Sequence, residues 1–253
     1  MKAIIIAAGS ATRLGELTKK IPKGLLKIND KSIIELQLEQ FRRNNILDVI
    51  IITGPNHEQF NFPGISLMND KKFHEHDVLG SLMTVKLEMN DELITSYSDI
   101  VFDDSILNSV LNFQGDVGIA IDLNWGKRYL DRTDHPRSEA DNVVIENNKI
   151  IKIKKNILEY TNSQQMGEFL GLMKLSKHGA EIFVKKYNTL LDTHEGRFQN
   201  APSLTKAYLT DLLQELIDSG VDVHPIFING EWNEIDTSQD LDQVKKKRNK
   251  SKD

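Results

Sequence analysis

The sequence predicts an α/β fold with a mostly parallel central sheet and helices on both of its faces. Three features predict it. Short runs of β-branched residues alternate with helical patterns, the first such run is continuously apolar, and a loop of small residues follows it directly. Strands of this kind that alternate with helices pair in parallel through right-handed crossovers, so we expect one open sheet.

The first half of the chain supplies most of this sheet. Residues 2–7 form a buried strand, and Ser32 with Glu35 makes a capping box that begins a helix. A second buried strand follows at 48–53. Four further elements, in the order strand, helix, strand and strand, are expected at 65–68, 81–89, 93–97 and 117–122.

The second half of the chain interrupts this pattern and then returns to it. Apolar periodicity weakens over residues 124–167, where a hairpin is expected around Asn147-Asn148. We interpret this region as a small insertion beside the sheet, within a single domain of residues 1–253. The remaining elements are expected at 168–175, 177–188, 209–219, 223–228 and 238–247, and the basic segment 246–253 is expected to be disordered.

The composition excludes several classes of protein. The chain has 253 residues, of which 39% are hydrophobic and 27% charged, so it can form a core and is not disordered by composition. It has no cysteine, which excludes disulfides, thiolate metal sites and a thiol nucleophile. The net charge of −5 argues against nucleic acid as the main partner. Because no apolar run could span a bilayer and no signal peptide is recognisable, we expect a cytoplasmic protein without membrane contacts.

The strand at 2–7 leads into a loop of small residues that is suited to phosphate binding. Small side chains let backbone N–H groups approach a polyphosphate closely. Arg13 would supply a forked cation to the outer phosphates, and Lys23 a point charge where negative charge develops on a transferring phosphoryl group. The spacing matches neither the Walker A motif nor the dinucleotide-binding motif. The expected nucleotide-binding residues of the loop are Ala7, Ala8, Gly9, Ser10, Ala11 and Thr12.

This region resembles the nucleotidyltransferases that make sugar nucleotides and CDP-activated head groups. Their signature AAGxGxRLxPLTxxxPKxLL is matched at Ala7-Ala8-Gly9, Arg13-Leu14, Leu17-Thr18, Pro22-Lys23 and Leu25-Leu26. The chain departs from the signature at Ala11, where most sugar nucleotidyltransferases have glycine, and at Gly15-Glu16, where Arg-Pro is common. The resemblance implies a Rossmann-like sheet of the nucleotide-diphospho-sugar transferase type, with a small acceptor-binding insertion.

Two aspartates are candidates for a Mg²⁺ site. Asp99 follows the strand at 93–97 at its carboxyl end, where open α/β sheets bind ligands. Asp236 lies in the segment WNEIDT, between the last strand and the last helix. Taken alone, the two could be a turn residue and a helix cap. The resemblance implies that they hold Mg²⁺ together, since the family uses an aspartate after a core strand and another in a WxEIDTxxDL-like segment.

The segment FHEHDVLGSL, residues 73–82, lies at the position of the base pocket in this family. The resemblance implies that Gly80 and Ser81 contact the nucleotide. His76-Asp77 stands where relatives tend to have Thr-Asn, which leaves the base specificity open. His74 and His76 do not have the spacing of a helical zinc site, so a loop or capping role is favoured for them.

The insertion combines cations, aromatic rings and carboxylates, which suits a small zwitterionic acceptor. Arginine binds a phosphate or phosphonate, while an aromatic face and a carboxylate hold an ammonium group. For each residue the alternative is an exposed loop with internal salt bridges. Lys155 lies where relatives place a lysine on the acceptor phosphate. The candidate acceptor-binding residues are Trp125, Arg128, Tyr129, Arg132, His135, Glu139, Asp141, Lys155 and Glu168.

Four longer segments narrow the resemblance. WxKRYxxRxxHPxxEAD, GEFLGLMKLS, AYLTDLLQELIDSG and WNEIDTSQDL look most like phosphonate cytidylyltransferases, in particular the 2-aminoethylphosphonate type. The resemblance implies transfer of CMP from CTP to a phosphonate in phosphonate biosynthesis, with release of pyrophosphate and a functional link to phosphoenolpyruvate mutase. The alternatives are phosphocholine, phosphoethanolamine or a sugar 1-phosphate as acceptor, or a catalytically silent nucleotide sensor. A homodimer is left open.

Overall fold

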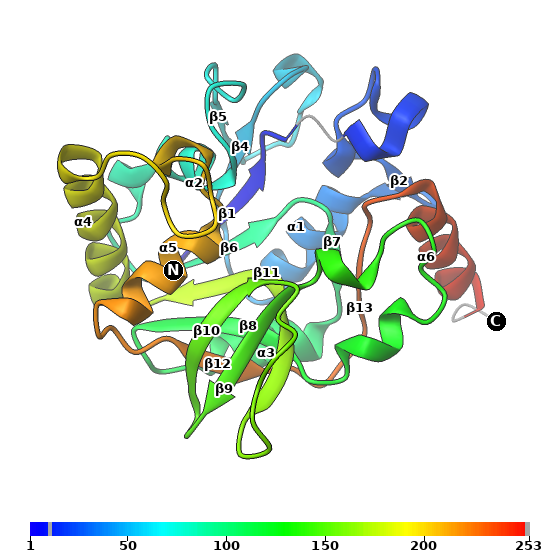
Figure 1. The fold of residues 1–253 in the computed structure, drawn as a ribbon. Helices are drawn as coiled ribbons and strands as arrows, with labels where there is room; N and C mark the ends of the chain where they lie inside the picture. The colour runs from blue at the N-terminus through cyan, green and yellow to red at the C-terminus, as the bar shows by residue number, and fades with distance from the viewer. Residues whose placement is uncertain (10–11, 251–253) are drawn as a thin grey trace.

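In a computed structural model, helices cover both faces of one large sheet (Figure 1). The structure describes residues 1–9 and 12–250, and within them nine strands form this sheet. Seven strands follow the order β10-β9-β11-β6-β1-β4-β5, while β8 pairs with β11 and β12 with β8. The strands are β1 (Lys2–Ala7), β4 (Asp48–Thr53), β5 (Ser66–Asn69), β6 (Leu93–Tyr97), β8 (Val117–Asp122), β9 (Asp141–Glu146), β10 (Lys149–Lys155), β11 (Gln165–Leu175) and β12 (His224–Phe227).

The part of the sheet around β1 is parallel, as the sequence predicts. β1 pairs in parallel with both β4 and β6, and β4 pairs in parallel with β5. The carboxyl ends of these strands therefore lie along one edge of the sheet, which brings the loops after β1 and β6 together. The predicted α/β fold class is confirmed.

The long strand β11 joins this parallel part to the region expected as an insertion. It runs antiparallel to β6, β8 and β9, an arrangement that the sequence did not predict. The hairpin of β9 and β10 turns at Asn147 and Asn148, which have φ values of 49° and 58° as a tight hairpin turn requires. The predicted hairpin is therefore present, and it extends the main sheet at its edge.

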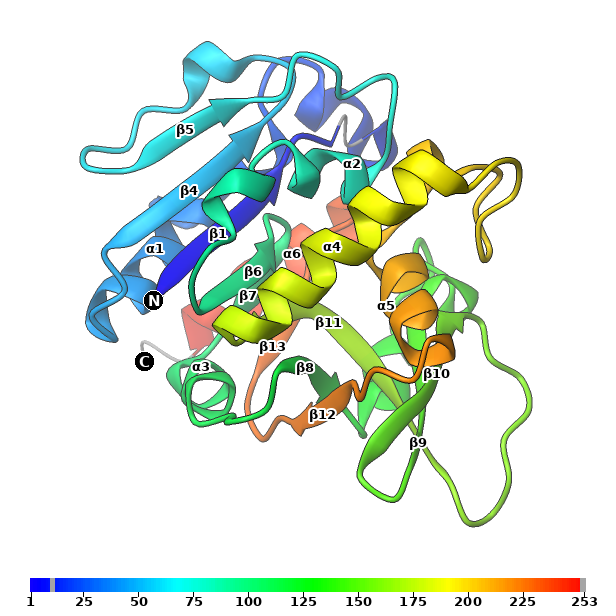
Figure 2. The same cartoon turned by 90° about the vertical axis from the view of Figure 1, so that its left-hand side faces the viewer.

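Helices lie on both sides of β1 (Figure 2), and they bury alternate side chains of this strand. Ile4 and Ile6 pack with α2, α4 and α5, whereas Ala3 and Ile5 pack on the opposite face with α1 and α3. The helices are α1 (Ile33–Arg43), α2 (Val78–Met83), α3 (Asp104–Leu111), α4 (Lys177–Thr193), α5 (Leu209–Asp218) and α6 (Ser238–Lys250). No helix in the described part of the chain has the length and apolar character needed to cross a membrane.

The first and the last α-helix can each be compared with a prediction from the sequence. Helix α1 begins at the predicted capping box: Glu35 N donates to Ser32 Oγ at 3.2 Å, and Ser32 N donates to Glu35 Oε2 at 2.6 Å. Helix α6 continues to Lys250, into the basic segment 246–253 that was expected to be disordered. The last three residues of that segment lie outside the described residues.

Two short strands that the sequence did not predict join the ends of distant segments. β7 (Ile100–Phe102) pairs antiparallel with β13 (Trp232–Glu234), and Ile235 N donates to Asp99 O at 2.9 Å. This pairing brings Asp99 beside Asp236. The remaining short elements are η1 (Thr12–Thr18), η2 (Lys23–Leu25), β2 (Lys27–Ile28), β3 (Lys31–Ser32), η3 (His57–Gln59), η4 (Lys86–Glu88), η5 (Trp125–Tyr129), η6 (Arg137–Glu139) and η7 (Leu204–Lys206).

Candidate active site

A cavity of about 600 Å³ opens at the carboxyl ends of β1 and β6. The phosphate loop, the base segment, the end of β6 and part of the insertion all contribute to its walls, as expected for a ligand site of an open α/β sheet. We call this cavity the active-site cavity. Twelve of the predicted site residues line it: Ala7, Ala8, Gly9, Arg13, Lys23, Ser81, Asp99, His135, Glu139, Asp141, Lys155 and Asp236.

The phosphate loop reaches the cavity through its first three residues. Ala7, Ala8 and Gly9 line the cavity. A Cβ atom at Gly54, just after β4, would clash with the backbone of Ala8, so glycine is required there for the two backbones to approach. Of the other predicted loop residues, Ser10 and Ala11 lie outside the described residues, and Thr12 begins η1.

Lys23 lies between the two predicted metal ligands. Its Nζ is 2.8 Å from Asp99 Oδ2 and also forms an ion pair with Asp236, while only 12% of its side chain is exposed. Burial alone would lower the pKa of Lys23, but the two carboxylates outweigh burial and raise the pKa. Lys23 is therefore a cation at neutral pH. Two aspartates that are far apart in the sequence therefore form ion pairs with the same ammonium group.

Asp236 is surrounded by further basic side chains. Its Oδ2 lies 3.1 Å from an Arg13 nitrogen and 3.1 Å from His135 Nδ1. Burial alone would raise the pKa of Asp236, but His135 and Lys23 hold it well below its usual range. Asp236 is thus a buried carboxylate that stays ionised, a state in which it can bind a cation or neutralise one.

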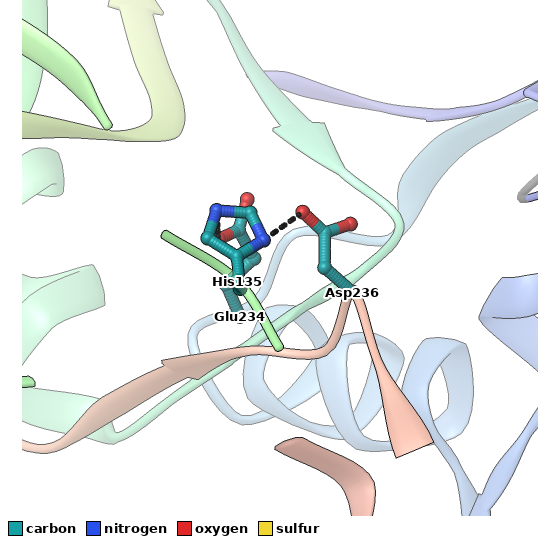
Figure 3. A group of neighbouring side chains, drawn as sticks. All are labelled: His135, Glu234 and Asp236. Carbon is teal, nitrogen blue, oxygen red and sulfur yellow. Dashed lines mark ion pairs between the residues drawn. The ribbon is translucent and has the colours of Figure 1, made fainter. Parts of the chain in front are cut away.

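Asp99 and Asp236 fit the predicted Mg²⁺ site. Asp99 Oδ1 is buried and has no hydrogen-bond partner within residues 1–9 and 12–250, which leaves a carboxylate oxygen free for a ligand. Mg²⁺ prefers one or two carboxylates together with phosphate oxygens and water. Another group, His135, Glu234 and Asp236, also brings its ligand atoms within 4.8 Å of one another (Figure 3). It includes a histidine, so it suits Mg²⁺ less well than the aspartate pair does.

The base segment brings one of its two predicted residues into the cavity. Ser81 lines the cavity and donates to Asp70 Oδ2 at 2.9 Å. Gly80 does not line the cavity. A Cβ atom at that position would clash with the ring of His76. The imidazole of His76, whose Nε2 lies 3.2 Å from Asp70 Oδ1, lines the cavity instead. Gly80 therefore makes room for the ring that contributes to the wall.

Two of the predicted acceptor residues lie outside the cavity and pack within the protein. Trp125 is buried, and the Arg137 guanidinium lies over its ring at 4.4 Å. Arg128 Nε donates to Asp122 Oδ2 at 2.7 Å, and its guanidinium lies 4.9 Å from the centre of the Trp232 ring. These partners account for the position of both side chains, and neither side chain reaches the active-site cavity.

Tyr129 and Arg132 also lie outside the cavity, directly behind its wall. The Tyr129 hydroxyl donates to Glu168. Arg132 Nε lies 2.7 Å from Asp240 Oδ1, and a terminal nitrogen of Arg132 lies 3.2 Å from Glu234 Oε2. The alternative of internal salt bridges therefore describes Arg128 and Arg132, which attach the insertion to the segment that carries Asp236.

The part of the insertion that does reach the cavity combines one lysine with two carboxylates. Lys155 Nζ lies 2.8 Å from Glu139 Oε2 and 5.7 Å from the centre of the Tyr208 ring. Burial raises the pKa of Asp141 to about 6, although nearby Lys155 acts in the opposite direction. This wall can pair with a phosphate or phosphonate through the lysine and with an ammonium group through the carboxylates.

Glu168 lies in a small recess that continues the cavity inward. The recess also includes Tyr97, Asp141 and Glu234. Burial and the charge of Glu234 raise the pKa of Glu168 to about 8, which outweighs the hydrogen bond from Tyr129. Its Oε2 has no hydrogen-bond partner in the described part of the chain. Glu168 thus faces the pocket region predicted for it, largely in its protonated form.

The cavity is also lined by residues that were not among the predicted site residues. Some of them neighbour predicted ones, as Glu234 neighbours Asp236, but Lys206 and Tyr208 come from a different segment of the chain. The segment is attached to the base loop, since Asp77 N donates to Thr205 O at 3.1 Å and Lys206 Nζ donates to His74 O at 3.3 Å. This long-range pairing places both residues at the cavity. Tyr208 lies in one of the four segments that carry the phosphonate-type resemblance, but nothing in the sequence assigned either residue to the site.

Known proteins with similar sequences include nucleotidyltransferases. Residues 2–74 match the family model described as nucleotidyl transferase. The CTP:phosphoglutamine cytidylyltransferase of Campylobacter jejuni is 26% identical, in a match that covers 97% of this chain and 100% of that protein. The choline-phosphate cytidylyltransferase of Streptococcus pneumoniae is 35% identical, over 44% of this chain and 50% of that protein.

Solved structures agree with the fold. The CTP:phosphocholine cytidylyltransferase from Streptococcus pneumoniae has a TM-score of 0.73 and 23% identity, with 98% of each chain covered. The inositol-1-phosphate CTP transferase from T. maritima has a TM-score of 0.72 and 20% identity, with 97% of this chain and 95% of that chain covered. The chain thus has the Rossmann-like fold of nucleotidyltransferases, and cytidylyltransferases are among its relatives.

Proposed function

We propose that this protein is a Mg²⁺-dependent cytidylyltransferase of the cytoplasm, which transfers CMP from CTP to a small acceptor and releases pyrophosphate. The observation that supports it most strongly is the ion-paired group of Lys23, Asp99 and Asp236 beside the phosphate loop. Such a group can neutralise a triphosphate and bind a metal ion, which is what nucleotidyl transfer requires. Relatives that are named as cytidylyltransferases favour CTP as the donor.

The reaction follows from positioning and charge neutralisation. An acceptor oxygen attacks the α-phosphorus of CTP in line, the bond from that phosphorus to the bridging oxygen breaks, and pyrophosphate leaves with the electron pair. A phosphate or phosphonate oxygen is already ionised near neutral pH, so no general base is required. Arg13 and Lys23 bind the triphosphate and neutralise developing charge. Mg²⁺ held by Asp99 and Asp236 would add Lewis-acid neutralisation of the triphosphate.

The acceptor that we propose is a phosphonate with an ammonium group, with 2-aminoethylphosphonate as the specific candidate. Lys155 would pair with the phosphonate, and Glu139 and Asp141 with the ammonium group. Phosphoethanolamine and phosphocholine present the same two charges, whereas a sugar 1-phosphate lacks the positive one. The four phosphonate-type sequence segments favour the phosphonate. Under this proposal, a phosphonate-forming enzyme such as phosphoenolpyruvate mutase acts earlier in the same pathway.

A pyrophosphate-release screen tests the proposal. The full chain is incubated with Mg²⁺ and each of CTP, UTP, ATP and GTP, combined in turn with 2-aminoethylphosphonate, phosphoethanolamine, phosphocholine and glucose 1-phosphate. We expect release with CTP and fastest release with 2-aminoethylphosphonate, and loss of release when EDTA is added. Pyrophosphate release only with glucose 1-phosphate would overturn the proposal that the acceptor is a phosphonate. Binding of CTP without release from any pair would favour the silent nucleotide sensor instead.

A further inference from the structure

A second cavity, of about 700 Å³, lies in the insertion and is separate from the active-site cavity. Its walls come from η5, η6 and the loop after β10. Neighbouring residues of three segments line the two cavities: Glu139, Asp141 and Lys155 line the active-site cavity, and Ser138, Asn142 and Asn156 line the second cavity. Asp141 and Asn142 are consecutive residues of β9 and point to opposite faces, so the two cavities lie back to back across the start of this strand.

The lining of the second cavity combines apolar and uncharged polar side chains with two cations, and it contains no aspartate or glutamate. Leu130 and Leu158 line it with 78% and 79% of their surface exposed, although apolar side chains of this size are usually buried. Arg137 and Lys127 also line it, and neither forms an ion pair with a carboxylate of the described residues. In a chain with a net charge of −5, a wall with two unpaired cations and no acid is complementary to an anion.

Asn142 gives an independent indication that the cavity has a ligand. Only 1% of its surface is exposed, and its Oδ1 accepts a hydrogen bond from Ile157 N at 3.2 Å. Its Nδ2 has no hydrogen-bond partner among residues 1–9 and 12–250. Buried donors are rarely left unpaired, because the lost hydration is costly. An acceptor atom of a bound molecule would satisfy this donor.

We propose that the second cavity binds a small anion with an apolar body, such as an aryl or branched-alkyl sulfonate, carboxylate or phosphate. The apolar body packs against Leu130, Leu158 and the edge of Trp125. The anionic group pairs with Arg137 and accepts a hydrogen bond from Asn142. The volume is within the usual range for small-molecule sites of about 300 to 1,000 Å³. Because the same segments line both cavities, an occupant also restrains the acceptor wall of the active-site cavity. This site does not depend on the proposed reaction.

Fluorescence titration with a matched pair of probes tests the proposal. The probes are 1-anilinonaphthalene-8-sulfonate and the neutral N-phenyl-1-naphthylamine, which lacks the sulfonate. In saturating CTP and Mg²⁺, we expect the sulfonate to bind at least about tenfold more tightly. Arg137→Gln should remove that preference and Arg137→Lys retain it, while Leu158→Ser weakens both probes. Leu87→Ser is the matched control, because Leu87 is 83% exposed and lies in η4, outside both cavities.

Amide hydrogen exchange locates the bound sulfonate independently of fluorescence. We expect slower exchange in residues 137–142 and 156–160 of the wild-type protein, and no such change in the Arg137→Gln variant at the same probe concentration. Equal sulfonate binding by wild type and Arg137→Gln would overturn the proposal, as would displacement of the sulfonate by CTP. A dimer in solution that binds no sulfonate would also overturn it, since the face would then be an interface between copies of the chain.

Discussion

The nucleotide side of the active-site cavity and its insertion side both contain basic side chains that are paired with carboxylates. The two sides differ in whether these ion pairs lie inside the cavity. On the nucleotide side, Lys23 and Arg13 converge on Asp236 inside the cavity. On the insertion side, Arg128 and Arg132 were expected in the same cavity, but both are paired behind its wall. The first pair belongs to the signature motif in the segment after β1, which begins at the carboxyl edge of the sheet. The second pair was inferred from the composition of the insertion. Composition gives the types of residue in a region but not the direction of their side chains.

The comparison also separates two kinds of ion pair. The Lys23 pairs lie at the cavity surface, where a triphosphate can add to them or replace them. The Arg132 pair with Asp240 is buried outside that cavity, and its two partners satisfy each other. A buried and fully paired arginine would have to give up its partner before it could bind a substrate, at a large cost. Both side chains are buried and ion-paired, so contact with the cavity is what separates the candidate binding residue Lys23 from the candidate positioning residue Arg132.

The largest effect is expected for Lys23→Ala, which removes the central cation of the nucleotide side. The turnover number should fall by about 10³-fold, because the charge that develops during transfer loses its neutralising partner. CTP affinity should fall by less than about tenfold, since Arg13 and the backbone loop remain. Pyrophosphate release and calorimetric CTP binding measure the two quantities. Lys19→Ala is the control, because Lys19 is exposed and forms an ion pair with surface Glu16. Near-normal turnover in Lys23→Ala would contradict the assignment.

Replacing either metal-site aspartate should have the next largest effect. Asp99→Asn and Asp236→Asn should each lower Mg²⁺-supported turnover by about 10²-fold, because an amide binds Mg²⁺ less well than a carboxylate. The checks are turnover as a function of Mg²⁺ concentration and Mg²⁺-dependent CTP binding. Asp222→Asn, in an exposed pair with Lys149, provides the control. Loss of activity in only one of the two variants would contradict a shared site.

Arg132→Gln and Arg128→Gln test whether the insertion positions the metal site or binds the acceptor. Asp240, the partner of Arg132, accepts hydrogen bonds from Asp236 N at 3.0 Å and Thr237 N at 2.9 Å. Arg132→Gln should therefore lower turnover by about tenfold and raise the Mg²⁺ requirement, with little change in acceptor KM. Arg128→Gln should leave turnover within about threefold and lower the melting temperature. An increase in acceptor KM for either variant would place that arginine in the acceptor site.

The fold was predictable where short-range patterns carry the information. The capping box at Ser32 and the parallel strands around β1 follow from local sequence. The short strands β7 and β13 did not, because three residues each give no usable periodicity and their pairing is entirely long-range. That pairing is what joins Asp99 to Asp236. The sequence therefore predicted the two residues by motif but not the element that brings them together.

The site was predictable to the extent that a residue's direction follows from its element. Asp99 follows β6, whose end faces the cavity, so its placement could be inferred. Lys23 begins η2, and its role was predicted from the signature motif. Lys206 is the last residue of η7, which is positioned by hydrogen bonds to the base segment, and no pattern indicates such a contact. Gly80 shows the converse, since it lies at a motif position but serves to accommodate His76. Side-chain direction in irregular segments depends on packing, which one sequence does not reveal.

Lys155→Ala should sharpen the comparison between the two sides of the cavity, because it should weaken binding of the acceptor and leave binding of CTP unchanged. Lys155 lines the cavity and keeps 44% of its side chain exposed, so a phosphonate can reach it. We expect an increase of about tenfold in acceptor KM with CTP affinity unchanged, measured by initial rates at saturating CTP. Lys154→Ala is the matched control, because this neighbour does not line the cavity. Equal effects of the two substitutions would show a general electrostatic contribution and no specific contact.

Glu168→Gln should have the smallest effect on activity and act through the pH dependence of stability. Burial raises the pKa of Glu168 to about 8, so the folded protein keeps a proton that the unfolded chain releases above its ordinary value of 4.5. The stabilisation from this group is complete below about pH 4.5 and is lost as the pH rises through 8. Between these values the wild-type free energy of unfolding should fall, relative to Glu168→Gln, by about 1 kcal/mol per pH unit.

In the Glu168→Gln variant, glutamine keeps the acceptor for the Tyr129 hydroxyl, so the fold should persist. Urea denaturation at several pH values measures the difference, with exposed Glu58→Gln as the control. Parallel profiles for wild type and Glu168→Gln would mean that Glu168 ionises normally in the folded protein, and the recess would then be an anionic wall at neutral pH.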